Sequence, residues 1–397
     1  MQPPRPVPVR PAAVLGFAAL LAIGWTGLLV PSLIRSIKGT FDQTDAGIGL
    51  LYLLYATAYA LGSFVGGPAT ERLGRRRVLL GAAALHAVGI VGLGLAPAWS
   101  VFVAVMVPAG FGAGVLDGGA NGLFLDLFRS GRGRAMNLLH VSFSIGALAA
   151  PLTVGALVTA GVAWQTVVIG TGLVVTVLAV GFGVVAMPSG RHDGEHASAG
   201  PQPRSVTGDA GGRAGRNVVP LVLLGVAILA YVASEVGVSN WLVRFLEPAP
   251  LETATLALSL FWAGLGVGRV ISSFVSDRFD HVRFTAACAI GIATCLIAAI
   301  FVPSLPLSIA LFALVGVFSG PIFPMIVAIG GERYADRSAA VSGVLIGFGV
   351  TGGTIYPPLM GLLSVTVGLT LAMVGTAVLA AACAAALLAF ERRLRRE

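Results

Sequence analysis

The chain has 397 residues, of which only 11% are charged, and its mean hydropathy is +0.92. An ordinary soluble domain has about 25% charged residues, so this composition excludes a water-soluble globular protein and indicates one whose surroundings are mostly lipid. The net charge of +8 does not indicate a nucleic-acid-binding protein, because the basic residues are spread over alternate loops instead of one soluble face.

Twelve apolar stretches follow one another along the chain, each near the roughly 20 residues that a transmembrane helix needs. The first could also be a cleaved signal sequence, but it is too long for an ordinary signal core and has no evident small-x-small cleavage site, so we interpret it as a helix. The expected spans are 12–34, 46–67, 78–96, 100–126, 135–160, 164–187, 218–244, 254–275, 284–302, 306–330, 338–363 and 368–390.

The basic residues predict the orientation of these spans. If the N-terminus is cytoplasmic, 22 of the 25 Lys and Arg fall in cytoplasmic segments, and only Arg35, Lys38 and Arg244 fall on the other side. The positive-inside rule therefore predicts a multi-pass protein of the inner (cytoplasmic) membrane with both termini in the cytoplasm.

Residues 188–217 interrupt the apolar pattern with Gly, Ser, Pro and charged residues, a composition typical of a linker. We therefore expect an all-α integral membrane protein with three parts. They are an N-terminal six-helix bundle at 1–187, a cytoplasmic linker at 188–217 and a C-terminal six-helix bundle at 218–397.

The second half of the chain repeats landmarks of the first at an offset of 206 residues. This offset carries Gly62 onto Gly268, Gly155 onto Gly361, and the segment Gly146-x4-Pro151 onto Gly352-x4-Pro357. The two Gly–Pro segments are expected to allow close packing and to bend their helices. Two homologous membrane halves are the architecture of a secondary transporter, in which two bundles rock about a central site.

Two carboxylates are expected deep in the membrane, Asp117 in the fourth span and Glu235 in the seventh. A charge at the bilayer centre costs at least about 2.5–3.5 kcal/mol, so such a group should face water, a partner or a substrate. Desolvation disfavours the charged carboxylate, and a cavity that opens to each side in turn could therefore load and release a proton there. We interpret both as proton-coupling residues; the alternative for each is a hydrogen bond between helices.

Polar and aromatic residues that could bind a solute lie in the same spans. Tyr52, Tyr55 and Tyr59 have the spacing of one helical face. Tyrosine suits a sugar, because a sugar offers hydroxyls at its edge and C–H groups on its face. Structural packing or hydrogen bonding is the alternative for each candidate. The candidate substrate-binding residues are Asn121, Asn137, His140, Tyr52, Tyr55, Trp25, Asn240, Trp241 and Tyr356.

Motifs of other classes are missing from the sequence. There is no Walker-type phosphate loop, so ATP-driven transport within this chain is not expected. The three cysteines lie in apolar spans and imply no disulfide framework. We expect neither an enzyme, nor a cofactor, nor a metal site.

One polar loop carries a family signature. Gly67-Pro-Ala-Thr-Glu71-Arg72-Leu-Gly74-Arg75-Arg76-Arg77 resembles the loop between helices two and three of the major facilitator superfamily, with Glu71 where the signature usually has Asp. The second-half copy keeps Asp277-Arg278. The resemblance implies the major facilitator fold, with a cytoplasmic gate that locks and releases during transport. The candidate gating residues are Gly67, Glu71, Arg72, Gly74, Arg75, Asp277 and Arg278.

Within that superfamily the chain most resembles the fucose permease-like sugar porters, which are fucose:proton symporters. The matching segments are 112–121, 136–146, 231–242, 320–324 and 352–358. Those symporters carry a carboxylate in the first helix a few residues before a proline. The corresponding segment here, from Trp25 to Pro31, has none.

The sequence thus predicts a transporter that works as a monomer and takes a small polar solute, in the first place a sugar, together with protons. A proton-antiporting exporter of amphipathic compounds would use the same fold and carboxylates, and the missing first-helix carboxylate keeps it open. A membrane sensor that transports nothing is a third reading, but it gives no role to the signature loop or the buried carboxylates.

Overall fold

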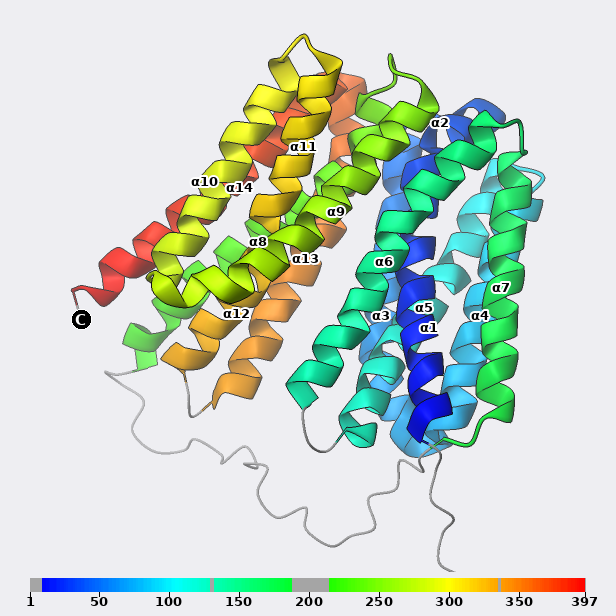
Figure 1. Cartoon of the computed structure of the whole chain (residues 1–397), viewed down its shortest axis with the longest axis horizontal. Coiled ribbons are helices and arrows are strands. Elements are labelled where there is room, and N and C mark those ends of the chain that lie inside the picture. Colours follow the sequence, from blue (N-terminus) through cyan, green and yellow to red (C-terminus); the bar gives the residue numbers. More distant parts are fainter. Residues whose placement is uncertain (1–8, 129–131, 188–213, 335–336, 397) are drawn as a thin grey trace, which may run out of the picture.

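The structure is a computed structural model that describes residues 9–128, 132–187, 214–334 and 337–396. Nearly all of them are helical, because only helices and closed barrels satisfy every backbone polar group inside lipid. Among the described residues, twelve helical segments are long and apolar enough to cross a membrane. The predicted number of spans is therefore confirmed, and the helices form two bundles of six spans (Figure 1).

The first bundle contains seven helices, because its first span is made of two pieces. They are α1 (Val9–Gly27), α2 (Leu29–Phe41), α3 (Asp45–Leu73), α4 (Arg75–Leu95), α5 (Trp99–Leu127), α6 (Arg132–Thr159) and α7 (Trp164–Val184).

The second bundle likewise has one span in two pieces, together with a short 3-10 turn. Its elements are α8 (Ala214–Phe245), α9 (Leu251–Val275), η1 (Ser276–Arg278), α10 (His281–Phe301), α11 (Leu305–Ser319), α12 (Ile322–Arg333), α13 (Ser338–Thr366) and α14 (Leu369–Leu394).

The interruptions of the helices do not lie at the two Gly–Pro segments, for which a bend stays a prediction. The Gly146–Pro151 and Gly352–Pro357 segments lie inside the continuous helices α6 and α13. A Cβ on Gly146 would lie 2.1 Å from the Leu21 carbonyl oxygen, so this glycine lets α1 pack closely on α6. The chain is broken instead after Gly27, where the first span continues as α2 beyond its expected end at residue 34, and after Ser319.

The offset of 206 residues is visible in the packing. A Cβ on Gly62 would lie 2.2 Å from the carbonyl oxygen of Phe111, and a Cβ on Gly268 would lie 2.0 Å from that of Val317. The offset carries both members of the first contact onto those of the second. Equivalent helices therefore pack through equivalent glycines in the two bundles.

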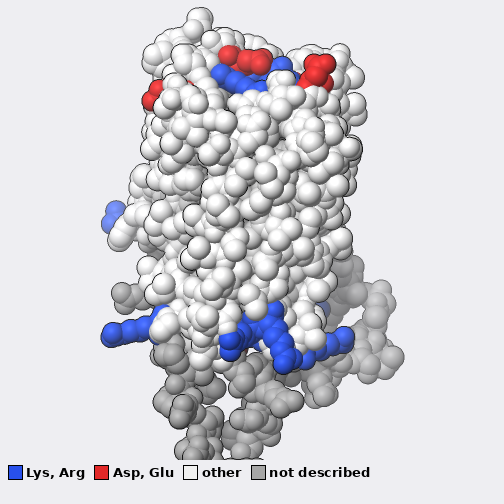
Figure 2. All heavy atoms as spheres, turned by 90° about the vertical axis from the view of Figure 1, so that its right-hand side faces the viewer, with Lys and Arg blue, Asp and Glu red and all other residues white. Residues whose placement is uncertain are grey.

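The two bundles meet through α2, α3 and α6 on one side and α8, α9 and α13 on the other. Figure 1 shows the ribbons of the bundles converging toward one end of the molecule and separating toward the other. On the face drawn in Figure 2, Lys and Arg gather in a band at the separated end, whereas the acidic residues lie at the convergent end. We call these the arginine-rich end and the convergent end.

Candidate functional site

A cavity of about 310 Å³ lies between the two bundles. Its wall comes from α1, α2, α3, α5 and α6 of the first bundle and from α8, α9 and α13 of the second. Most of the lining is aliphatic or aromatic, and the described residues that line it include no Lys, Arg, Asp or Glu. The cavity is thus an uncharged chamber with a few polar groups in its wall, the usual character of a small-molecule site.

The three tyrosines of α3 all line this cavity, as their spacing predicts for one helical face. Tyr52 lies nearest the convergent end, and its hydroxyl donates a 3.0 Å hydrogen bond to the carbonyl oxygen of Asn240 in the other bundle. Tyr55 and Tyr59 follow toward the arginine-rich end, with ring centroids 6.2 Å apart. The tyrosine face therefore provides a hydrogen bond between the bundles near the convergent end, and aromatic ring surface toward the arginine-rich end. That the tyrosines bind a solute stays a prediction.

Asp117 of α5 lies directly behind Tyr59. The Tyr59 hydroxyl donates to Asp117 Oδ2 at 2.8 Å, and Asn121 Nδ2 donates to Asp117 Oδ1 at 2.9 Å. The other amide atom of this asparagine, Oδ1, is buried and accepts no hydrogen bond from the described residues. The structure thus brings Asp117 and Asn121 together, as their one-turn spacing predicts.

Of the two candidates in the fifth span, His140 lies near this cluster. His140 is exposed on α6, and its imidazole would attract the Asp117 carboxylate when it is protonated. The side chain of Asn137 lies outside the described residues. A proton relay between His140 and Asp117 stays a prediction.

Glu235 of α8 forms a second cluster with Tyr231. The Tyr231 hydroxyl contacts Glu235 Oε2 and also lies 2.8 Å from the carbonyl oxygen of Ser319, at the break between α11 and α12. A hydroxyl has one proton to donate, and a carbonyl can only accept. Both contacts are therefore satisfied when the Glu235 carboxyl carries a proton and donates it to Tyr231. The charge of Arg269 on α9 also acts on Glu235.

Three aromatic candidates do not line the cavity. The indole of Trp25 donates to Thr171 Oγ1 at 3.1 Å, and that of Trp241, fully buried, donates to the carbonyl oxygen of Pro357 at 2.9 Å. The Tyr356 hydroxyl donates to the carbonyl oxygen of Ala372 at 2.8 Å. Each polar atom of these rings thus has a protein partner, which agrees with the structural alternative for them. Asn240, by contrast, lines the cavity.

Several residues at the cavity do not belong to the predicted set of substrate-binding residues. Thr26 lines the wall and lies 3.0 Å from Nε2 of the buried His86, whose Nδ1 lies 2.8 Å from the Ala109 carbonyl oxygen. Trp262 lines the opposite wall and donates to Ser239 Oγ at 3.1 Å. A lone histidine in an apolar helix indicates packing, and no local pattern links it to a threonine 60 residues away.

The signature loop lies at the arginine-rich end. Gly74 has a φ of 84°, which favours glycine at this turn between α3 and α4. Arg75 is buried and pairs with Asp126 at 2.5 Å, whereas Arg72 and Arg278 are exposed. The side chains of Glu71 and Asp277 lie outside the described residues, so the predicted gating contacts of those carboxylates stay predictions. Gly67 lies inside α3 with open space around it.

The chain is similar to known transport proteins along nearly its whole length. The family model of the Major Facilitator Superfamily matches residues 13–250 and 221–397. A glucose/mannose transporter of Bacillus subtilis is 23% identical over 366 residues, which cover 89% of this chain and 88% of that one. A cis,cis-muconate transport protein of Acinetobacter baylyi is 25% identical over 369 residues, with coverage of 87% and 88%. The crystal structure of a D-xylose-proton symporter matches with a TM-score of 0.75 at 14% identity, covering 96% and 98% of the two chains.

Proposed function

The chain belongs to the Major Facilitator Superfamily, and we propose that it is a secondary transporter that moves a sugar across the cytoplasmic membrane together with a proton. The observation that carries the proposal is the cavity between the bundles, because its tyrosine-lined wall adjoins the Asp117 cluster. A solute in the cavity and a proton on Asp117 would then occupy neighbouring sites, with Tyr59 between them. Rocking of the bundles would expose that chamber to each side in turn.

The lining of the cavity favours an uncharged solute. A dicarboxylate such as muconate would need cations in the wall, because a buried anion without a partner is costly, and the described lining residues include no Lys or Arg. Tyr55, Tyr59 and Trp262 offer aromatic faces, and Asn240 offers a polar edge. This combination suits a sugar, and the glucose/mannose transporter among the similar proteins agrees with it.

The hydrogen bonds of Asp117 support its role as the proton-coupling residue. Both carboxylate oxygens accept a hydrogen bond, Oδ2 from Tyr59 and Oδ1 from Asn121, which is the arrangement of an ionised carboxylate. A proton on Oδ2 would require the Tyr59 hydroxyl to reverse its role or to turn away. Because Tyr59 lines the cavity, a change of protonation at Asp117 would alter the surface that the solute meets.

We propose further that the arginine-rich end is cytoplasmic, that both termini lie in the cytoplasm and that the chain works as a monomer in the inner membrane. The helix α1 starts at that end, and α14 ends at it (Figure 1). The band of basic residues supports this orientation through the positive-inside rule. The central cavity is built from one chain and needs no second copy.

An exporter of amphipathic compounds driven by proton antiport is the second candidate. The specific observation that favours it is the largely aliphatic lining, to which Val232, Val236 and Met106 contribute. The first span also lacks a carboxylate between Trp25 and Pro31. In the sugar symporter the solute and the proton move in the same direction, whereas in the exporter they move in opposite directions.

Liposomes that contain the protein and a pH-sensitive dye test the proposal. Sugars are added outside, and wild type is compared with Asp117→Asn. Acidification inside that depends on the sugar and disappears in the variant is the expected result. Glu252→Gln is the matched control, because it removes an exposed carboxylate far from the cavity and should leave the signal unchanged.

Other outcomes assign the alternatives. Alkalinisation inside on adding an amphipathic compound, with no response to any sugar, would support the exporter instead. A sugar response that Asp117→Asn leaves intact would remove Asp117 from the coupling mechanism but keep sugar transport.

A further inference from the structure

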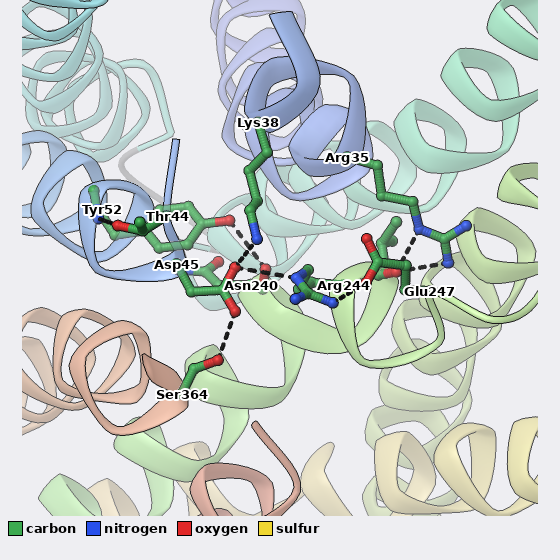
Figure 3. A network of polar contacts seen from close by, with 11 residues as sticks. Arg35, Lys38, Thr44, Asp45, Tyr52, Asn240, Arg244, Glu247 and Ser364 are labelled. Atoms are coloured by element: carbon green, nitrogen blue, oxygen red, sulfur yellow. Dashed lines mark hydrogen bonds and ion pairs between the residues drawn. The ribbon is translucent and has the colours of Figure 1, made fainter. Parts of the chain in front are cut away.

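Many of the hydrogen-bond donors in the wall of the central cavity already have a protein acceptor. The Tyr52 hydroxyl, for example, donates to the Asn240 carbonyl oxygen (Figure 3). The wall side chains that donate in this way are those of Tyr52, Tyr59, Trp262 and Thr354. The other polar side chains of the described lining are those of Thr26, Tyr55, Ser239 and Asn240. A hydroxyl or an indole has one proton to donate, so half of the polar side chains in the wall have none left for a solute.

The backbone of the same wall offers acceptors. In an α-helix the carbonyl oxygen of a residue accepts from the N–H four positions later, and proline has no N–H. Three residues that line the cavity have a proline at that position: Gly27 of the first bundle, before Pro31, and Gly353 and Thr354 of the second, before Pro357 and Pro358. Each bundle therefore contributes carbonyl oxygens that lack their usual helical donor.

Gly27 lies at the break between α1 and α2. Since glycine has no side chain, only its backbone lines the cavity at this position. A Cβ at Gly27 would meet no atom within 4 Å, so the space beside this backbone is open. The break thus leaves an accessible stretch of backbone in the wall, next to Thr26.

The hydroxyl of Thr26 has a specific acceptor behind the wall, the imidazole of His86. Nδ1 of His86 lies 2.8 Å from the Ala109 carbonyl oxygen, which can only accept, so Nδ1 carries a proton. The ring is fully buried, and in the neutral imidazole Nε2 is then an acceptor. A buried acceptor without a partner is costly. Thr26 Oγ1, at 3.0 Å, is placed to donate to it.

Two backbone carbonyl oxygens compete for the same proton. Those of Ala22 and Ile23 lie 2.9 and 3.3 Å from Thr26 Oγ1. Both residues lie within α1, where each carbonyl has the N–H four positions later as its helical partner. Nε2 of His86 has greater need of the proton, so the Thr26 hydroxyl donates to His86. Lone pairs of Thr26 Oγ1 then remain as acceptors for the cavity.

We propose that the cavity binds its solute through hydrogens that the solute donates, and that Thr26 Oγ1 and the Gly27 carbonyl oxygen form an acceptor pair that selects for free hydroxyl groups. Thr26 is then a specificity-determining residue, and His86 is a positioning residue because it acts through Thr26. The described lining has no cation to pair with an anion, so the solute class is a neutral polyhydroxy compound. The inference deepens the proposed sugar transport and rests on it for the nature of the solute.

Nitrogen NMR of the protein in liposomes, with isotopically labelled histidine, tests the acceptor without any solute. The signals of His86 are those absent from His86→Phe. They should show a protonated Nδ1 and an unprotonated Nε2 that accepts a hydrogen bond. Thr26→Val keeps the shape of the side chain and should move the Nε2 resonance toward that of a nitrogen without a hydrogen bond. A protonated Nε2 in the parent protein overturns the proposal.

Thr176→Val is the matched control for the NMR measurement. Thr176 of α7 donates to the Gly172 carbonyl oxygen of its own helix and does not belong to the described lining. The His86 signals should be the same in this variant as in the parent. A shift of Nε2 in Thr176→Val as large as in Thr26→Val would count against a specific bond between Thr26 and His86.

Uptake of glucose and of its monodeoxyfluoro analogues by proteoliposomes tests how the acceptor pair is used. Fluorine replaces one hydroxyl in each analogue and donates no hydrogen bond. In wild type at least one analogue should have a KM about 2- to 12-fold above that of glucose. Thr26→Val should bring this ratio close to one, because the acceptor is gone. Pro31→Ala supplies an N–H for the Gly27 carbonyl oxygen and should also lower the ratio for at least one analogue.

Pro108→Ala is the matched control for uptake. Pro108 removes the helical partner of the Ala104 carbonyl, but Ala104 is exposed on α5 and does not belong to the described lining. Its KM ratios should equal those of wild type. Ratios that persist in Thr26→Val, or that fall as far in Pro108→Ala, overturn the acceptor pair. If Pro31→Ala aggregates, Thr26→Val decides the question alone.

The two measurements separate this inference from the proposed function. If wild type takes up no sugar, the proposed function fails, whereas the NMR signals of His86 still decide whether Thr26 is an acceptor. If wild type takes up glucose and all its analogues with one KM, sugar transport stands and the acceptor pair is overturned.

Discussion

Tyr59 separates Asp117 from the cavity: its ring lines the wall, and its hydroxyl donates to the Asp117 carboxylate behind it at 2.8 Å. The solute site and the ionisable site are therefore distinct but share one side chain. A proton at Asp117 and a solute in the cavity can influence each other through the position of that hydroxyl, without direct contact.

Asp117→Asn should abolish accumulation against a gradient while leaving exchange of labelled for unlabelled solute across the membrane. Asparagine keeps the shape and can still hydrogen-bond to Tyr59 and Asn121, but it cannot gain or lose a proton. Uptake and exchange are measured in the same proteoliposomes. Loss of exchange together with uptake would mean that Asp117 serves solute binding or folding instead of coupling.

Tyr59→Phe should move the pH dependence of uptake toward higher pH. The hydroxyl donates to the ionised carboxylate, and its removal makes the protonated form of Asp117 relatively more favourable. The shift is measured from initial uptake rates over a range of roughly pH 5.5 to 8.5. An unchanged pH profile with a lowered maximal rate would indicate that Tyr59 acts only in packing.

Tyr55→Phe should weaken solute binding, whereas Tyr356→Phe should not. Tyr55 lines the cavity, but the Tyr356 hydroxyl is bonded to the Ala372 carbonyl away from it. The loss of one neutral hydrogen bond costs about 0.5–1.5 kcal/mol, so the KM for uptake should rise roughly 2- to 12-fold. Equal effects of the two variants on KM would count against the proposed binding face.

Glu235→Gln should remove one infrared band of a protonated carboxyl group from the spectrum of the protein near neutral pH. The expectation follows from the Tyr231 hydroxyl, whose single proton cannot serve both Ser319 and an ionised Glu235. Tyr231→Phe should shift the same band, because it changes the hydrogen bond of the carboxyl. Identical spectra of wild type and Glu235→Gln would show that Glu235 is ionised in this state.

Gly361→Ala should disfavour closure at the convergent end. A Cβ at this position would lie 2.4 Å from the Asp45 carbonyl oxygen, and overpacking of this kind costs about 1–3 kcal/mol. Gly347→Ala on the same helix has open space and is the control. Spin labels that replace Gly39 of α2 and Val367, which follows α13, report the separation of the two bundles at this end, because both positions are exposed. The distance between these labels should lengthen in the first variant only. A shift in both would point to a general loss of helix packing.

The parts of the molecule that follow from local pattern could be predicted from the sequence. The twelve spans follow from hydropathy, the tyrosine face from its helical spacing, and the equivalent glycine contacts from the repeat. The pair Asp117–Asn121 also lies one turn apart, and the structure joins the two side chains.

The polar network around Asp45 at the convergent end could not be predicted in this way, because its members are far apart in the chain. Asp45 pairs with Arg244 across 199 residues and with Ser364 across 319. In the sequence Asp45 is a polar residue at the end of a span, and the basic residues appear only as exceptions to a topology rule. The break after Gly27 was also missed, because glycine and proline are common throughout these helices and only tertiary packing decides where they interrupt one.

The two interrupted spans are not related by the repeat. The break after Gly27 falls in the first span of the first bundle, and the corresponding span of the second bundle, α8, is continuous. The break after Ser319 falls in the tenth span, and its counterpart α5 is continuous. Each bundle therefore has one interrupted span at a position of its own, although the two bundles share the same architecture. The two bundles are therefore not built identically, and we expect the helices to rearrange differently when the molecule opens toward one side of the membrane and toward the other.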